Sequence, residues 1–405
     1  MFKLVFFILV IFSFNSHSIF AQNQTINNKI NLVFNSINFL GTHNHSRSHN
    51  KGMVNYNVKY HLKNLSSKLT FNYDDYNKFT FDGSYLQYNK GIATIGVGSI
   101  NRLWSFSDNT SLILSHNARP TKSIYLNLKN RFGYDWLPAK ANWSLEVFNG
   151  ITEGSYKNSK SMLIGARAIL SPNERLNLEL VQTSQWGGSD YSTGLSSLNA
   201  ALFTDTNESA NANINKMAGF GISYLIPHDN VALRIYGQMI GEDEAGNLPS
   251  CFSYMAGLEW SNTKLKYPTT LTIESVNTRI KKTTNGNCGA NTMYNNGIYD
   301  YTHYGTSMGA EIDSQGTSLG IFGKSQISEK INIEYLTKVL VINEKDWPDH
   351  RLSSNRQEGS KSLLGVSWKR NAITLKSNIY FQDFILDKAK INSKYGVGIS
   401  SSIIF

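Results

Sequence analysis

Cysteine, proline, charge and long apolar runs are all scarce in this chain of 405 residues. It contains 2 Cys and 7 Pro, and 17% of its residues are charged. Two cysteines are too few for a disulfide-framework protein or a cysteine-rich metal scaffold. Low charge combined with 12% aromatic residues excludes an intrinsically disordered or coiled-coil protein. After residue 22 no stretch approaches the roughly 18 apolar residues of a spanning helix, which excludes a helical membrane protein.

The N-terminus has the character of an export signal. One Lys is followed by an apolar run over 4–12 and then by small and polar residues up to Ala21. This order is typical of a secretory signal peptide. We expect residues 1–21 to be the signal, cleaved after Ala21 or alternatively after Ser18, and residues 22–405 to form one exported domain.

The mature sequence is dominated by alternating segments of about ten residues. Apolar and polar residues alternate over 53–62, 330–342 and 372–383. Soluble sandwiches alternate too, but their strands usually have five or six residues. Strands of roughly ten residues with one apolar face fit a bilayer that is crossed at a tilt. No segment shows sustained helical periodicity. The fold class we predict is all-β: a transmembrane antiparallel β-barrel of the bacterial outer membrane with long extracellular loops.

The C-terminus strengthens this prediction. Apolar residues occupy one face of the last strand, namely Tyr395, Val397, Ile399, Ile403 and the terminal Phe405. Gly396, Gly398, Ser400 and Ser402 occupy the other face, and Ser401 is the one weak outward position. An alternating strand that ends in Phe resembles the assembly signal of bacterial outer-membrane barrels.

Connection lengths give the strand count and the topology. We place strands at 29–40, 53–62, 67–75, 79–88, 91–99, 122–131, 141–150, 161–170, 174–185, 216–226, 229–240, 252–261, 268–280, 315–325, 330–342, 360–370, 372–383 and 393–405. If the C-terminus is periplasmic, the long connections all lie outside, at 100–121, 186–215, 241–251, 281–314 and 343–359. Short connections then lie inside, as outer-membrane barrels require. This gives about 18 strands with both termini in the periplasm.

Motifs that carry catalytic or metal chemistry are weak. GTSMG at 305–309 has nucleophile-elbow spacing around Ser307, but that elbow needs a following helix, so we interpret it as a Gly-rich external loop. His43, His45 and His49 have a spacing that could bind a transition metal, although we favour a polar surface loop. We predict no enzymatic activity, no catalytic residues, no metal site and no cofactor.

The two cysteines fall in neighbouring external loops. Outside the cytoplasm a disulfide bond between Cys251 and Cys288 is plausible. Chain entropy would make such a bond worth roughly 4 kcal/mol. We therefore expect the two residues to be bridged.

Two loop segments carry a family resemblance. NRLWSFSDNTSLILSHNARP at 101–120 and YGQMIGEDEAGNLPS at 236–250 resemble signature segments of the capsule-assembly Wzi family. Further similarity runs through GLEW at 257–260 and YNNGIYDYTHYGTSMGAEIDSQG at 294–316, and together it covers most of 53–405 in matching order. The resemblance implies an 18-stranded outer-membrane barrel that acts as a surface lectin and holds capsular polysaccharide on the cell.

The chain departs from the family pattern in two places. The family tends to carry Trp-Trp-Gly-Pro after the Arg, whereas this chain reads Arg102-Leu103-Trp104-Ser105. Members of the well-known type also carry a periplasmic helical bundle before the barrel. Here about seven residues separate the expected cleavage site from the first expected strand, so we expect no such bundle.

Sugar recognition needs aromatic faces and planar polar groups, and the expected external loops supply both. The candidate polysaccharide-binding residues are Trp104, Asn117, Arg119, Trp186, Glu242, Asp243, Glu244, Tyr299, Tyr301 and Tyr304. Arg suits acidic sugars through paired contacts. Because they are placed in loops, Trp104 and Trp186 are expected to be dispensable for barrel assembly. An alternative is that LILSHNARP folds into the lumen, with Arg119 paired to the carboxylates at 242–244.

The net charge of +10 would attract acidic capsule, or would neutralise lipopolysaccharide phosphates. We predict a non-enzymatic, lectin-like barrel in the outer membrane of a Gram-negative bacterium. Its expected partners are capsular polysaccharide, outer-membrane lipid and lipopolysaccharide, with no nucleic acid, and it is expected to be a monomer. The alternative is a channel for small or sugar solutes, because 18 strands enclose a wide lumen unless loops fill it.

Overall fold

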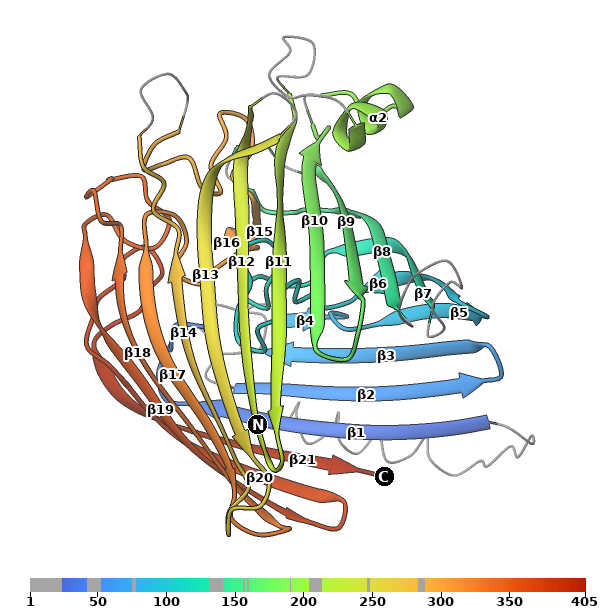
Figure 1. Cartoon of the computed structure of the whole chain (residues 1–405), viewed down its shortest axis with the longest axis vertical. Coiled ribbons are helices and arrows are strands. Elements are labelled where there is room, and N and C mark those ends of the chain that lie inside the picture. The colour runs from blue at the N-terminus through green and yellow to red at the C-terminus, as the bar shows by residue number, and fades with distance from the viewer. Residues whose placement is uncertain are drawn as a thin grey trace.

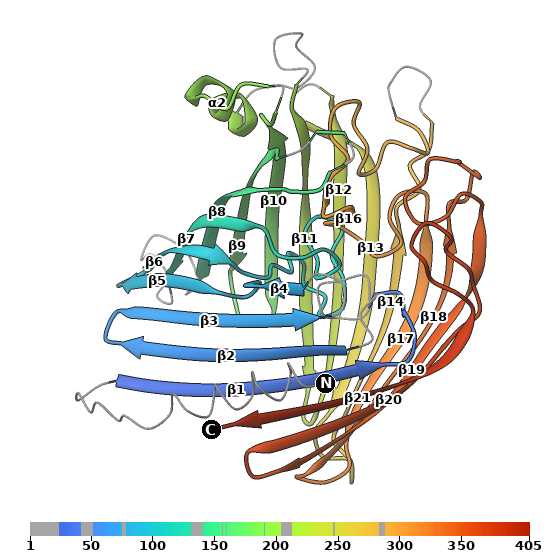
Figure 2. The same ribbon diagram turned by 180° about the vertical axis from the view of Figure 1, so that it is seen from behind.

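The computed structural model describes residues 24–41, 52–74, 78–130, 141–155, 157–158, 160–189, 191–203, 213–245, 248–282 and 288–405. Its strands wrap around a central lumen, so that the strands of the near and far walls cross at a large angle in Figures 1 and 2. Every pairing between neighbouring wall strands is antiparallel.

The first half of the wall contains β1 (Gln24–Asn35), β2 (Gly52–Leu62), β3 (Leu65–Asp74), β4 (Lys78–Thr80), β5 (Tyr85–Lys90), β6 (Ala93–Ser99), β7 (Lys122–Asn130), β8 (Asn142–Ile151), β9 (Met162–Ser171) and β10 (Leu176–Trp186). The second half contains β11 (Asn215–His228), β12 (Val231–Ala245), β13 (Leu248–Asn262), β14 (Thr269–Asn277), β17 (Thr317–Gln326), β18 (Ile331–Ile342), β19 (Gln357–Arg370), β20 (Ile373–Gln382) and β21 (Lys394–Ile404). A two-stranded hairpin, β15 (Thr302–His303) with β16 (Thr306–Ser307), and one helix, α2 (Leu195–Phe203), complete the described elements.

Pairing of the first strand with the last closes the sheet. β1 pairs with β21 over seven registered positions, from Lys29 opposite Ile404 to Asn35 opposite Gly398. The sheet contains 19 named strands, but β4 and β5 both pair with β3 and occupy one position in the wall. The barrel is therefore 18-stranded, which confirms the predicted fold and count.

The predicted strand positions hold with three exceptions. The strand expected at 79–88 is divided into β4 and β5 by a turn at 81–84. The first strand begins and ends five residues earlier than expected, because Phe39 and Leu40 leave the wall and are buried inside the barrel. The expected loop at 241–251 is instead part of β12 and β13, which continue their ladder beyond Gly241 and pair as far as Ala245 with Leu248.

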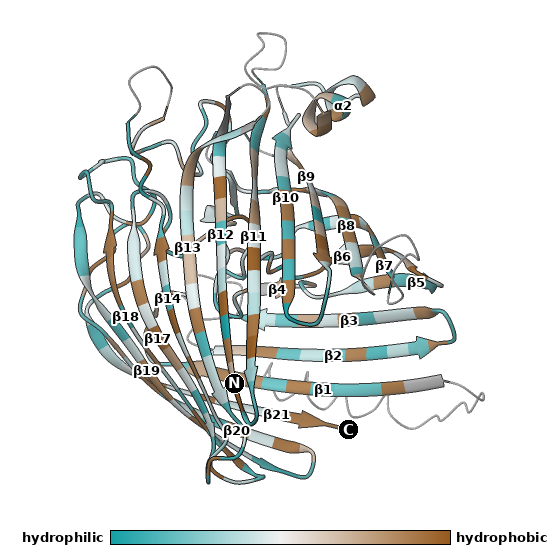
Figure 3. Ribbon diagram, in the orientation of Figure 1, coloured by the Kyte–Doolittle hydropathy of each residue, from teal (hydrophilic) through white to brown (hydrophobic). Residues whose placement is uncertain are grey.

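Alternation along each strand separates a lipid-facing side from a lumen side. On β20, Ile379 points outward and its side chain is 56% exposed, whereas Asn378 and Tyr380 are hydrogen-bonded to each other on the inner side. Figure 3 shows the resulting alternation of hydrophobic and hydrophilic bands along the strands. An outer surface of this kind fits the hydrocarbon of a bilayer, since the pairing of β1 with β21 leaves neither terminal strand with an open edge in lipid.

The helix α2 was not anticipated from the sequence. It lies against the outer face of β10, where Gln182 and Ser184 donate hydrogen bonds to the carbonyl of Ala201 at 3.4 and 2.7 Å. Underneath it, Trp186 and Ile164 are buried in a small apolar cluster. Among the described residues no helix is long and apolar enough to cross a membrane.

Unequal effects on stability are expected from the same charge placed on the two sides of one strand. Ile379→Arg puts a cation in the lipid near the middle of β20 and should cost about 2–4 kcal/mol of folding stability. Asn378→Arg puts it in the polar lumen beside Glu334 and should be nearly neutral. The measurement is urea unfolding in detergent micelles, with the heat-induced gel shift as a check of folding. Equal destabilisation by both variants would contradict the assigned faces.

Candidate functional site

The lumen is filled on the extracellular side by loops that turn inward. We call residues 100–121 and 293–316 the plug. Both segments contribute to a single buried apolar cluster with inward-facing wall residues, among them Trp104, Leu112, Ile113, Tyr294, Tyr301, Met308, Ile312, Leu340, Leu352 and Phe384. Residues expected to form external loops therefore form the core of the protein.

Hydrogen bonds join the two plug segments to each other. The phenol of Tyr294 donates to the carbonyl of Leu112 at 2.6 Å, and the phenol of Tyr301 donates to the carbonyl of Ile113 at 2.9 Å. The wall residue Gln238 accepts from the backbone N–H of Leu112 at 2.9 Å. These bonds satisfy backbone groups that the irregular segment could not pair by itself, as burial requires.

Buried ion pairs attach the plug to the wall. The carboxylate of Glu311 contacts the ammonium groups of Lys338 on β18 at 2.7 Å and of Lys361 on β19 at 2.8 Å. Burial alone would raise the pKa of Glu311, but the two lysines hold that pKa at about 2. Asp313 makes a two-point pair with the guanidinium of Arg351 in the next extracellular loop. Burial opposes the charged form of Asp313 as well, yet Arg351 lowers its pKa.

Several candidate sugar-binding residues are part of this core, which corrects the prediction made for them. Trp104 is 1% exposed, and its indole donates to Glu146 at 3.2 Å and packs edge-on against Phe148. Tyr301 and Tyr299 are also buried, and Tyr299 donates to backbone carbonyls. A buried ring presents no face to a polysaccharide, so these residues maintain the plug.

The segment LILSHNARP folds into the lumen, but its expected ion pair is different. Arg119 pairs with Asp82, at 2.6 and 3.1 Å, and lies 4.1 Å above the ring of Tyr304. Asn117 donates to the carbonyl of Ser307 at 3.0 Å. The expected pairing of Arg119 with the carboxylates at 242–244 is therefore wrong, because Asp82, in the turn between β4 and β5, lies beside it.

The acidic residues on β12 are also placed differently from the prediction. Glu242 is buried and accepts a hydrogen bond from the backbone N–H of Tyr294 at 3.1 Å. Asp243 and Glu244 continue the same strand, and their side chains lie outside the described part of the structure. Trp186 is buried under α2 on the outer face of the barrel. Glu242 and Trp186 are therefore both buried, and neither offers an open contact surface.

Two further motifs can be placed. Cys251 and Cys288 form a disulfide bond, with their Cα atoms 5.3 Å apart, which ties the β12–β13 hairpin to the chain leading into the plug. Ser307 is buried on β16 inside the lumen, so GTSMG is neither a strand-to-helix turn nor an external loop. The cluster of His43, His45 and His49 lies outside the described residues.

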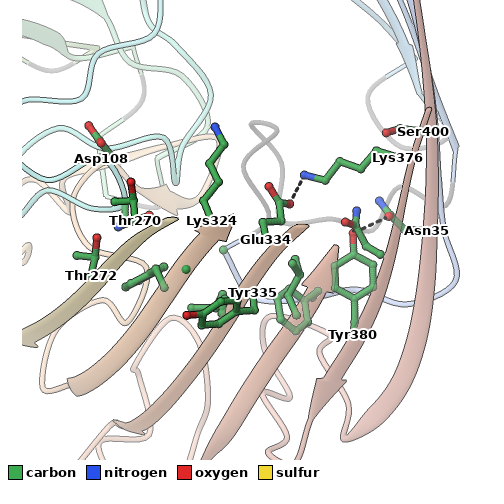
Figure 4. A pocket seen from close by; sticks show the side chains of 18 of the residues that line it. Asn35, Asp108, Thr270, Thr272, Lys324, Glu334, Tyr335, Lys376, Tyr380 and Ser400 are labelled. Carbon is green, nitrogen blue, oxygen red and sulfur yellow. Dashed lines mark hydrogen bonds and ion pairs between the residues drawn. The ribbon is translucent and has the colours of Figure 1, made fainter. Parts of the chain in front are cut away.

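A cavity of about 660 Å³, lined by both apolar and polar side chains, lies within the barrel (Figure 4). Its lining includes Lys324, Glu334 and Lys376 from three neighbouring strands, with Glu334 and Lys376 forming an ion pair. Both Lys324 and Glu334 lie close to the short turns at the end of the barrel that carries the two termini. The plug thus occupies one end of the lumen, and charged groups of both signs line the remaining space.

One aromatic residue at the extracellular surface was missed by sequence reasoning. Trp347 is partly exposed in the loop 343–356. Its backbone N–H donates to the side-chain oxygen of Asn343 at 2.8 Å, and its backbone carbonyl accepts from the side-chain nitrogen of Asn343 at 2.9 Å. Lys345 is exposed beside it, and the ammonium of Lys388 contacts the carbonyl of Pro348. The signal was a lone Trp in an expected external loop, with cations close by in the sequence.

Comparison with known proteins assigns the family. The sequence pattern of the protein family described as capsule assembly protein Wzi matches residues 21–372, which is most of the chain. The chain belongs to the Wzi capsule-assembly family. The architecture agrees: the structure of Escherichia coli Wzi, an outer-membrane, carbohydrate-binding β-barrel involved in group 1 capsule assembly, superposes with a TM-score of 0.77 at 20% identity, covering 93% of this chain and 84% of that one.

More distant similarities define the limits of the comparison. An uncharacterised 55.8 kDa protein in the cps region of Klebsiella pneumoniae is 25% identical over 186 residues, covering 45% of this chain but only 37% of that relative. Pseudomonas aeruginosa OprD has a similar fold at 8% identity, with a TM-score of 0.53 and coverage of 96% and 97%. The match to the family over most of the chain shows membership, whereas the structural similarities, at 20% identity or less, show only the fold.

Removing the carboxylate that links plug and wall should loosen the plug. Glu311→Gln leaves two buried ammonium groups without their anion, and we expect a several-fold rise in ion conductance in planar bilayers at pH 7. A carboxyl with a depressed pKa stabilises fully above its ordinary 4.5 and loses this contribution as pH falls through about 2. The wild-type protein should therefore show the same rise when the pH is lowered through that window.

The control is Glu358→Gln, which removes an exposed carboxylate paired with Arg356 in the loop above the barrel. It should leave conductance unchanged, because exposed pairs contribute little. A Glu311→Gln protein that conducts like the wild type across the pH range would show that this ion pair does not hold the plug.

Proposed function

We propose that this protein is an outer-membrane barrel that binds capsular or related surface polysaccharide and holds it on the cell. Membership of the Wzi family supports the role in capsule assembly. The observation that carries the proposal is the plug, because hydrogen bonds and ion pairs fix it to the wall and make the extracellular surface the part available to a polymer. The chain acts by binding rather than by catalysis.

The proposed cellular setting follows from the same reasoning. We place the barrel in the outer membrane of a Gram-negative bacterium, exported with a signal peptide cleaved after Ala21 and surrounded by lipid and lipopolysaccharide. The functional unit is a monomer.

The polysaccharide-binding surface we propose is centred on Trp347. An indole face suits the C–H surface of a sugar ring, and the exposed cations Lys345 and Arg356 of the same loop suit carboxylates of acidic sugars. Lys388 and Lys390, exposed in the neighbouring extracellular loop, add two further cations, and the exposed carboxylates Asp346 and Asp349 stand among them. The surface replaces the buried aromatic residues that the sequence had suggested.

A solute channel is the competing function, because a ring of 18 strands encloses a wide lumen unless loops fill it. The plug argues against a permanently open pore, because an apolar core and buried ion pairs occupy the lumen. Single-channel recording on the wild-type protein separates the two functions. A steady large conductance would favour the channel, whereas silence at neutral pH would favour the binding protein.

Loss of the surface indole should weaken retention of polysaccharide. Deleting the gene is expected to shift high-molecular-weight polysaccharide from the cell-associated to the released fraction, with total synthesis unchanged. Complementation with Trp347→Ala should restore retention only in part, whereas Trp347→Phe, which keeps a ring, should restore more. The readout is the ratio of attached to released polymer, normalised to the amount of folded barrel.

Trp143→Ala is the matched control, because Trp143 lies on β8 near the opposite end of the barrel and should leave retention intact once folding is checked. An unchanged distribution of polysaccharide in the deletion strain would refute the retention function. Normal retention by Trp347→Ala, with a clear defect in the deletion strain, would refute only the assigned surface.

A further inference from the structure

The barrel wall is interrupted at the extracellular end of β4. β4 pairs with β3 through Tyr73 opposite Phe79, and among the described residues its other edge has no strand partner. The strand that would cover that edge is β6, but β6 ends at Ser99, where the chain turns inward to form the plug. β7 then begins at Lys122, directly opposite Ser99. A lateral notch, lined by residues of both strands, therefore separates β4 from the start of β7.

The rim of the notch is apolar and faces outward. The notch encloses about 690 Å³, and its lining includes Phe79, Phe81, Val97, Ile124, Ile151 and Met162. Phe79 and Ile124, on opposite sides of it, are each 60% exposed. Tyr73 and Phe71 extend the aromatic surface across β3 through ring contacts with Phe79 and Phe81. The notch is thus continuous with the lipid-facing surface of the barrel.

The floor of the notch is polar, which distinguishes it from the rest of that surface. Arg119, Asp82 and Tyr304 form it together, with the guanidinium placed between the carboxylate and the phenol ring. Lys122 stands at its edge with its side chain 68% exposed, at 3.1 Å from Glu153. The side-chain oxygen of Asn149, another lining residue, is buried and accepts no hydrogen bond in the described structure.

These features select an amphiphile. The rim suits acyl chains, whereas the floor offers an aromatic face, an unpartnered acceptor and paired charges, the groups that recognise sugar hydroxyls and amides. Two cations and two carboxylates balance each other, so a bare anion is not the preferred ligand. The exposed ammonium of Lys122 at the edge adds a contact for a phosphate beside the sugar.

We propose that the notch binds an acylated, phosphorylated sugar lipid of the outer leaflet, with its chains against the aromatic rim and its headgroup on the Arg119–Tyr304 floor. Asn149 would accept a hydrogen bond from a hydroxyl or amide of the headgroup, and Lys122 would contact its phosphate. The site rests on the proposed placement of the barrel in the outer membrane, but it does not depend on polysaccharide binding. The notch gives the barrel one specific lipid contact in addition to the nonspecific contacts of its lipid-facing surface.

Native mass spectrometry of the full chain in detergent micelles tests the site, with lipid A as the probe. The wild-type barrel should retain one lipid A molecule and bind it at least fivefold more tightly than phosphatidylglycerol. Lys122→Gln and Phe81→Ser should each lower this occupancy several-fold. The controls are Lys264→Gln, at a turn near the opposite end, and Ile235→Ser, on the lipid-facing side of β12. Both should bind lipid A as the wild type does, and the heat-induced gel shift verifies folding.

Three results would overturn the proposal. Equal binding of phosphatidylglycerol would indicate ordinary boundary lipid, and equal binding of the deacylated lipid A disaccharide would indicate a sugar site without a lipid requirement. Unchanged occupancy in both notch variants would exclude the notch itself. Polysaccharide retention measured with the same variants keeps the two proposals apart, because the notch variants should retain polymer normally even where lipid A binding is lost.

Discussion

Closure of the sheet by β1 and β21 is the constraint on which the rest of the structure depends. In hydrocarbon every backbone N–H and C=O of the wall must find a partner in a neighbouring strand, and a ring of strands satisfies this without an edge. A ring of this size encloses a space too wide for wall side chains alone to fill. In this chain the inward loops fill that space. Together with inward-facing wall residues, their apolar residues form the only large buried cluster among the described residues.

Filling the lumen creates an electrostatic requirement of its own. The inner wall is polar, and it carries Lys338 and Lys361 at the level of the plug. Burying two ammonium groups without a counter-charge would be costly, and Glu311 supplies that charge from the plug. Attraction between wall and plug thus aligns the irregular segment in one position. This attraction supports the proposed binding function over the competing channel.

The sequence was sufficient for the wall and insufficient for the plug, for a physical reason. Alternation in β18 or β20 is local, so strand positions and their count can be read directly from neighbouring residues. Whether a long loop folds in or out depends on contacts between distant segments, such as Arg119 with Asp82 or Tyr301 with Ile113. Aromatic residues that hold a plug look the same in sequence as those that bind a sugar. The plug and the notch have a common origin. The chain leaves the wall at Ser99 to form the plug, and this departure leaves one edge of β4 uncovered.

The disulfide between Cys251 and Cys288 has a consequence for the order of assembly. Its partners are 37 residues apart, so the bond closes a covalent ring that contains most of β13 and all of β14. Such a ring can form in an oxidising compartment before the chain reaches a membrane. A chain that arrives already cross-linked would bring the plug segment into the growing barrel tethered to the β12–β13 hairpin. The lumen would then be filled while the wall is closing, so that no open pore need exist at any stage of assembly.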